Sequence, residues 1–173
     1  MTKEQCLNLI LDQGCTFAQA IGLLANIEAE SAYYENALGD KNAQGEFTSY
    51  GLCQWHATRW DRLKKYAGTA TTVPAATQIQ FILYEMEKWY PKTYKIFKDI
   101  GNDQAGAEKF AYYFCYNYEV PADRKNKSMK RAERASELYE ELYKEPLNLD
   151  RVFDDILFYT SNIEELIRQW KKQ

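Results

Sequence analysis

One stretch constrains the fold of this chain more than any other: residues 17–32, which carry apolar side chains on nearly every side of an expected helix. A start signal precedes the stretch, because Thr16 stands three residues before Gln19 in the pattern of a capping box. We expect the helix to run to about Ala32. Its apolar residues are Phe17, Ala18, Ala20, Ile21, Leu23, Leu24, Ala25 and Ile27. Such a helix packs on several sides, so the rest of the chain must be arranged around it.

Two glutamates, Glu28 and Glu30, stand near the end of this buried helix. Because each residue turns the helix by about 100°, they point to nearly opposite sides and cannot work as a pair across one cleft. Only one is expected to be catalytic, and periodicity alone does not choose which. Glu30 shares its side with Gln19, Leu23 and Asn26, a mixed stripe such as a cleft wall carries. The simpler alternative is that both are solvated charges where the helix emerges.

Helical periodicity stops over residues 35–55, and turn-forming residues take its place. They are Gly39, Asp40, Asn42, Gly45 and Ser49. We interpret this region as an irregular hairpin or Ω-like excursion. Its last part, from Tyr50 to Trp55, contains a glycine between aromatic residues and is suited to lining a groove. Loops on a rigid scaffold are common positions for binding groups.

Three segments, NIEAESAY at 26–33, SYGLCQW at 49–55 and YNYEVPAD at 116–123, resemble motifs of the phage tail lysozyme family. That family belongs with goose-type lysozymes and lytic transglycosylases in the lysozyme-like fold. The resemblance covers roughly residues 3–143 in consistent order. In the family, the glutamate followed directly by serine is the catalytic acid, which maps onto Glu30. The same resemblance implies that Tyr50, Gln54 and Tyr118 line sugar subsites. Cys53 departs from the motif, where a larger apolar residue is usual.

The expected fold class is therefore mainly α, of the α+β lysozyme-like kind: a helical domain with a small irregular β-hairpin region that forms one wall of a cleft. The 173 residues suffice for one domain with a real core. We expect a lysozyme-like catalytic domain over residues 1–145 and a C-terminal helical extension over residues 146–173. Further helices are expected over residues 3–12, 57–66, 75–89, 91–101, 103–118 and 128–143.

Cleavage of the β-1,4 bond between N-acetylmuramic acid and N-acetylglucosamine needs a carboxylic acid that keeps its proton at neutral pH, usually by removal from water. Glu30, at the end of an apolar helix with aromatic neighbours, is placed for this role.

A second carboxylate would stand across the bond. Asp40 is the best candidate and Glu46 the next, although Gly-Asp-Lys-Asn is also a good turn. Goose-type relatives can manage with one glutamate and a positioned water, and transglycosylases form 1,6-anhydro products. We favour hydrolysis because the resemblance is to phage lysozymes.

Two other classes of function stay open. A cysteine peptidase would use Cys53 and His56, although such dyads usually come from separate elements. A catalytically silent, wall-binding virion protein would keep the fold without turnover. We expect Glu119 to cap a helix or pair with Arg124, and His56 to be structural.

Composition bears on partners and setting. The net charge of −3 provides no overall attraction to nucleic acid or an anionic membrane. The four cysteines lack C-x-x-C spacing, so neither a metal site nor a cofactor is expected. The sequence shows neither a signal peptide nor an apolar run of about eighteen residues. We expect synthesis in a host cytoplasm and action on bacterial peptidoglycan after release as an endolysin, or as a tail lysozyme in contact with other phage tail proteins.

Overall fold

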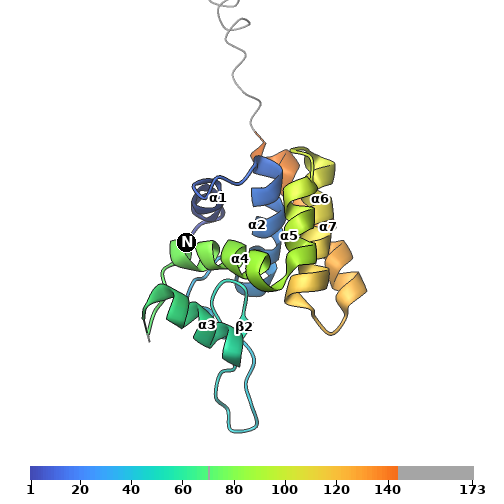
Figure 1. Cartoon of the computed structure of the whole chain (residues 1–173). Helices are drawn as coiled ribbons and strands as arrows, with labels where there is room; N and C mark the ends of the chain where they lie inside the picture. Colours follow the sequence, from blue (N-terminus) through green and yellow to red (C-terminus); the bar gives the residue numbers. More distant parts are fainter. Residues whose placement is uncertain (70, 144–173) are drawn as a thin grey trace, which may run out of the picture. The chain divides into compact units, whose positions relative to one another are not determined.

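Helices make up most of the structure, a computed structural model that describes residues 1–69 and 71–143 (Figure 1). In chain order, the helices are α1 (Lys3–Leu11), α2 (Phe17–Ser31), α3 (Ala57–Ala67), α4 (Ala75–Trp89), α5 (Pro91–Asp99), α6 (Gln104–Phe114), the π-helix η1 (Cys115–Glu119) and α7 (Arg124–Leu142). Two short strands, β1 (Ser49–Tyr50) and β2 (Trp55–His56), lie between α2 and α3. The expected extension over residues 146–173 lies outside the described residues. The mainly helical, lysozyme-like fold class is confirmed.

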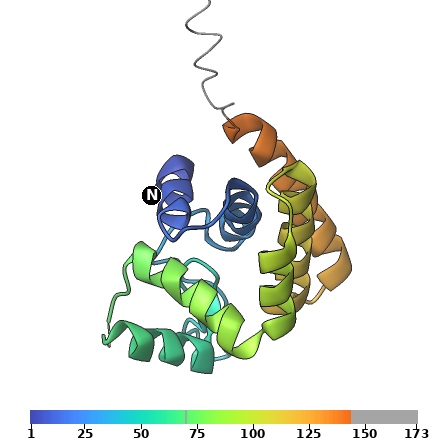
Figure 2. The same ribbon diagram turned by 45° about the horizontal axis from the view of Figure 1, so that its top comes forward.

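Helix α2 lies at the centre of the core, as its all-round apolar sequence predicts. Both bonds of the Thr16–Gln19 capping box are present, and Ala32 ends the helix in the left-handed conformation at φ 49°. Helices α1, α6 and α7 pack against it. The close approach of α6 depends on Gly22, because a Cβ there would lie 2.7 Å from the Phe110 ring. In both ribbon views α6 and α7 run side by side (Figures 1 and 2).

Two polar residues of α2 connect this buried helix to its neighbours. The Gln19 side-chain amide donates to the Phe97 carbonyl at 2.7 Å, and the Asn26 amide donates to the Ala111 carbonyl at 3.1 Å. Both side chains are buried, so these hydrogen bonds compensate for the loss of water. They fix α2 against α5 and α6, which determines where the end of α2 emerges.

The predicted hairpin region is present as a small antiparallel sheet. Ser49 pairs with His56 and Tyr50 with Trp55, and isolated bridges join Leu38 to Tyr50 and Lys41 to Phe47. The loop that carries these bridges projects away from the helices in Figure 1. Gln78 of α4 secures the base of the region, because its side-chain oxygen accepts from the Leu52 amide at 2.8 Å.

Two helix boundaries differ from the sequence predictions by more than two residues. The helix expected over residues 103–118 is α-helical only to Phe114 and continues as η1, which ends where Val120 turns left-handed at φ 55°. The helix expected from Ser128 begins at Arg124 instead, and Ser128 is buried inside it. Residues 124–127 are all polar or charged, so they carry no apolar periodicity from which a helix start could be recognised.

Within the described part of the chain, none of the helices combines the length and apolar character needed to cross a membrane.

Candidate active site

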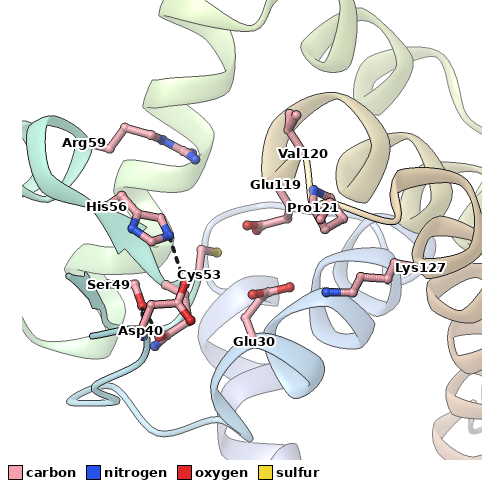
Figure 3. A pocket seen from close by; sticks show the side chains of 12 residues that line it. Glu30, Asp40, Ser49, Cys53, His56, Arg59, Glu119, Val120, Pro121 and Lys127 are labelled. Carbon is pink, nitrogen blue, oxygen red and sulfur yellow. Dashed lines mark hydrogen bonds and ion pairs between the residues drawn. The ribbon is translucent and has the colours of Figure 1, made fainter. Parts of the chain in front are cut away.

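A cleft of about 520 Å³ lies where the end of α2, the hairpin region, the start of α3 and the turn after η1 meet (Figure 3). It is lined by Glu30, Asp40, Ser49, Cys53, Gln54, His56, Arg59, Glu119, Val120, Pro121, Ala122 and Lys127. Eight of these twelve residues come from the three segments that the sequence singles out, residues 26–33, 49–55 and 116–123, and the other four are Asp40, His56, Arg59 and Lys127. Segments far apart in the sequence therefore form one site.

Glu30 lines this cleft and Glu28 does not. The Glu30 carboxylate points into the cleft, where Lys127 directs its ammonium towards it (Figure 3). Arg131 of α7 donates to Glu30 Oε1 at 3.0 Å. Glu28 instead forms an ion pair with Arg134, and the hydrogen bonds from that guanidinium lower the pKa of Glu28. The spacing argument that only one of the two glutamates reaches a given cleft agrees with this arrangement.

Asp40 stands on the opposite wall, at the solvent edge of the cleft. Its side chain is 80% exposed, and its carboxylate lies 3.6 Å from Nε2 of His56. The backbone of Asp40 also takes part in the turn, since its amide donates to Ser49 Oγ. His56, expected to be structural, is itself well exposed and lines the rim. Glu46, the second candidate, accepts a hydrogen bond from Asn42 and is absent from the cleft lining.

Of the three residues expected to line sugar subsites, Gln54 is the one in the cleft lining. Its side-chain oxygen accepts from Ser49 Oγ at 2.8 Å, and its amide donates to the Gly51 carbonyl at 3.0 Å. Tyr50 lies outside the lining, with its ring stacked on Trp60 at a centroid distance of 5.3 Å. The amide of Gln54 is therefore held by its neighbours and presented to the cleft.

Tyr118 lies beneath the cleft and is 1% exposed. Its hydroxyl donates to the buried carboxylate of Glu85 in α4, and the Arg59 guanidinium lies 4.3 Å from the centre of its ring. A sugar could reach this ring only if the core opened. In the structure, Tyr118 packs beneath the cleft floor and is absent from the cleft lining.

Glu85 is the centre of a buried polar network that the sequence did not reveal. Its carboxylate accepts two hydrogen bonds from Arg59, at 2.9 and 2.8 Å, one from Trp55 at 3.1 Å and one from Tyr118. Arg59 also donates to the Tyr118 carbonyl, next to Glu119. One signal was available: Gln78 and Glu85 stand seven residues apart in the apolar stripe of α4, where polar residues on a buried face imply partners.

Glu119 faces Glu30 across the cleft (Figure 3). Burial, followed by the nearby charge of Glu30, raises the pKa of Glu119 to about 8, while Arg59, the Cys53 thiol and Arg131 act in the opposite direction. Among the described residues no ion pair joins it to Arg124, whose guanidinium instead lies 4.9 Å from the ring centre of Tyr116. The expectation that Glu119 caps a helix or pairs with Arg124 is therefore wrong.

Cys53 lacks the environment of a cysteine nucleophile. Its side chain is buried, and this burial raises the pKa of the thiol well above its ordinary value. Reactive cysteines need a lowered pKa and access to substrate, because the thiolate is the attacking form. The histidine that a cysteine peptidase would pair with Cys53 is His56, and its imidazole lies close to the carboxylate of Asp40 (Figure 3).

Nowhere in residues 1–69 and 71–143 do three or more His, Cys, Asp or Glu side chains gather in a way that could hold a metal ion.

Comparison with known proteins identifies the family. The family model for phage tail lysozymes matches residues 1–142, nearly all of the described chain. A search of curated proteins finds no match. The family supports a lysozyme-like enzyme that acts on peptidoglycan, and the mainly helical fold with its two-stranded sheet is consistent with it. The chain belongs to the phage tail lysozyme family.

Proposed function

We propose that this protein is a peptidoglycan hydrolase that cleaves the β-1,4 bond between N-acetylmuramic acid and N-acetylglucosamine, with Glu30 as the general acid. The observation that carries the proposal is the position of Glu30 at the end of a buried helix, where its carboxylate points into the main cleft of a phage tail lysozyme family member. Asp40 on the opposite wall is the second carboxylate that the sequence singles out.

Glu30 acts by giving a proton to the oxygen of the leaving sugar, which lowers the barrier to breaking the glycosidic bond. The glutamate is left as an anion, which the neighbouring Arg131 and Lys127 stabilise. The same cations suit the carboxylates of peptidoglycan itself. Arg131 and Lys127 could bind these carboxylates, whereas an uncharged glycan offers no charged group for them to bind.

Gln54 is suited to recognise an acetamido group of the substrate. One N–H of its amide is engaged by the Gly51 carbonyl, and an amide nitrogen has two donors. The second N–H is therefore available to an acceptor in the cleft. Tyr50 and Tyr118 take part indirectly, by packing behind the walls that hold Gln54 and Glu119.

The decisive experiment is mass spectrometry of purified peptidoglycan digested with the wild type, Glu30→Gln and Glu28→Gln. Glu28 is a matched control, because it lies on the same helix and also pairs with an arginine of α7, but lies outside the cleft. We expect reducing muropeptides from the wild type and Glu28→Gln, and intact glycan from Glu30→Gln. Products with 1,6-anhydro ends would make the enzyme a lytic transglycosylase instead.

Substantial cleavage by Glu30→Gln would refute the assigned role of Glu30. Intact glycan with every variant, together with binding of the wild type to sedimented walls, would favour a silent wall-binding virion protein. Western blotting of purified virions tests whether the protein is an endolysin or a tail-associated lysozyme, because a tail-associated lysozyme remains with the particle and an endolysin does not.

A further inference from the structure

A groove of about 380 Å³ lies between α3 and α4, outside the cleft that holds Glu30. The two helices contact each other and lie next to one another in Figure 2. No residue of the groove lines the cleft, so this is a second concave surface that takes no part in the proposed cleavage step. It is lined by Arg62, Lys65, Tyr66, Phe81, Tyr84 and Trp89.

Three large aromatic side chains of the groove remain exposed to solvent. Tyr66 is 43% exposed, Tyr84 is 38% exposed and Trp89 is 42% exposed. They form a row, because the ring centres of Tyr66 and Tyr84 are 5.0 Å apart and those of Tyr84 and Trp89 are 5.6 Å apart. The buried ring of Phe81 packs against Tyr66 at 5.4 Å. Since these rings already hold one another, a ligand would lose little free energy in ordering them.

Two cations of the groove have no carboxylate partner. Arg62 and Lys65 are exposed, and neither forms an ion pair within residues 1–69 and 71–143. The other cations of α3, Arg59 and Lys64, each pair with a carboxylate. The Arg62 guanidinium lies 4.9 Å from the centre of the Trp89 ring. Positive charge is therefore available directly beside the aromatic row.

The groove continues a face of α3 that begins in the cleft. Arg59 lines the cleft, and Arg62 and Tyr66 follow it after three and seven residues. At this spacing the three side chains share one side of the helix. With a rise of 1.5 Å per residue, Tyr66 lies about 10 Å beyond Arg59 along the helix axis. A polymer that leaves the cleft along α3 thus meets the groove after a short distance.

We propose that the groove is a second binding site for peptidoglycan, which holds a segment of the wall that is not being cut. This inference rests on the proposed action on peptidoglycan. Flat aromatic rings pack on the apolar faces of sugar rings, and the two unpaired cations complement the carboxylates of the wall peptides. A polyol phosphate such as teichoic acid would satisfy the cations, but its backbone offers the aromatic row no sugar ring. Peptidoglycan supplies both kinds of group in one polymer.

A second site changes how the enzyme stays on its substrate. Attachment at the groove makes binding in the cleft an event within one complex, with a high effective concentration of substrate. The enzyme then remains on the wall when the cleft releases a product.

Sedimentation with purified peptidoglycan sacculi tests the site, with Glu30→Gln as the parent protein so that the walls stay intact. We expect Tyr66→Ala in this parent to weaken binding by about 3- to 10-fold, the usual effect of removing one aromatic contact. The matched control is Tyr113→Ala, because Tyr113 is 37% exposed on α6 and lies outside the groove lining. This control should bind like the parent.

A charge reversal keeps the test valid if Tyr66→Ala does not fold. Lys65→Glu changes an exposed residue and should weaken binding by about 3-fold or more at low ionic strength. The difference should shrink at high salt, which screens exposed charges. Lys109→Glu makes the same change at an exposed position of α6 and should have little effect.

The outcomes separate the two proposals. Undiminished binding by both Tyr66→Ala and Lys65→Glu overturns the second site and would favour a phage protein as the partner of the groove. A loss of binding that is seen only with walls that retain teichoic acid, and not after hydrofluoric acid has removed it, also overturns the proposal. Digestion of the sacculi by Glu30→Gln itself overturns the proposed function instead.

Discussion

Replacing Glu85 by glutamine should lower the free energy of unfolding by far more than the similar size of the two side chains suggests. Glu85 is fully buried, and its carboxylate is the acceptor for Arg59, Trp55 and Tyr118. Glutamine keeps the shape but removes the charge, so a mostly buried guanidinium loses its counter-ion. Breaking one partner of a buried ion pair costs about 3 to 5 kcal/mol of the free energy of unfolding. We expect Glu85→Gln to fall in this range.

Urea unfolding at neutral pH, followed by circular dichroism, measures this loss. The matched control is Glu137→Gln, which removes the charge of an exposed carboxylate from an ion pair with Arg134. Exposed pairs contribute about 1 kcal/mol or less, so the control should unfold close to the wild type. A Glu85→Gln protein within about 1 kcal/mol of the control would refute the reasoning that this network is a desolvated charge pair.

Three further predictions concern the cleft and the core. Between the ordinary pKa of 4.5 and the raised pKa of about 8, folded Glu119 holds a proton that the unfolded chain releases, so the free energy of unfolding of the wild type should fall as pH rises through this window. Measured by urea denaturation relative to Glu119→Gln, the fall should reach about 1.4 kcal/mol per pH unit. The same pH dependence of the free energy of unfolding in both proteins would contradict this prediction. Cys53→Ala should retain glycan cleavage in the muropeptide assay, because the buried thiol is not the nucleophile; its inactivation without unfolding would restore the peptidase hypothesis. Gly22→Ala should lower the free energy of unfolding by about 1 to 3 kcal/mol in urea, because its Cβ would overlap the Phe110 ring, and an unchanged midpoint would show that α6 can move away.

Local signals explain why much of the fold was predictable. The Thr16–Gln19 capping box and the apolar body of α2 involve neighbouring residues, and both appear as expected. Turn residues likewise predicted the hairpin region. The start of α7 was missed because its first turn is polar on all sides, and its stability comes from packing of the later residues on α2 and α6.

The site was less predictable because the burial and the charged neighbours of its side chains come from several helices and from the hairpin region, which are distant in the sequence. Spacing separated Glu30 from Glu28, and only the family resemblance selected Glu30. Glu119 was misjudged because its surroundings come from α2, the hairpin region and α3, none of which is near it in the sequence. Tyr118 stands beside Glu119 in the same motif, yet η1 turns its ring into the core. Sequence adjacency does not reveal which of two neighbouring side chains faces a cleft.

The pairing of the α2 glutamates with α7 has a consequence for biosynthesis. The ion pair of Glu30 with Arg131 spans 101 residues, and that of Glu28 with Arg134 spans 106. A ribosome delivers α2 long before α7, so a growing chain carries its two glutamates without their arginines until nearly all of the described residues have emerged. Contacts this distant in sequence form late, because a long loop must close first. The Glu30–Arg131 side of the cleft is thus completed only after α7 has been synthesised, and any chain that stops before α7 lacks this pair.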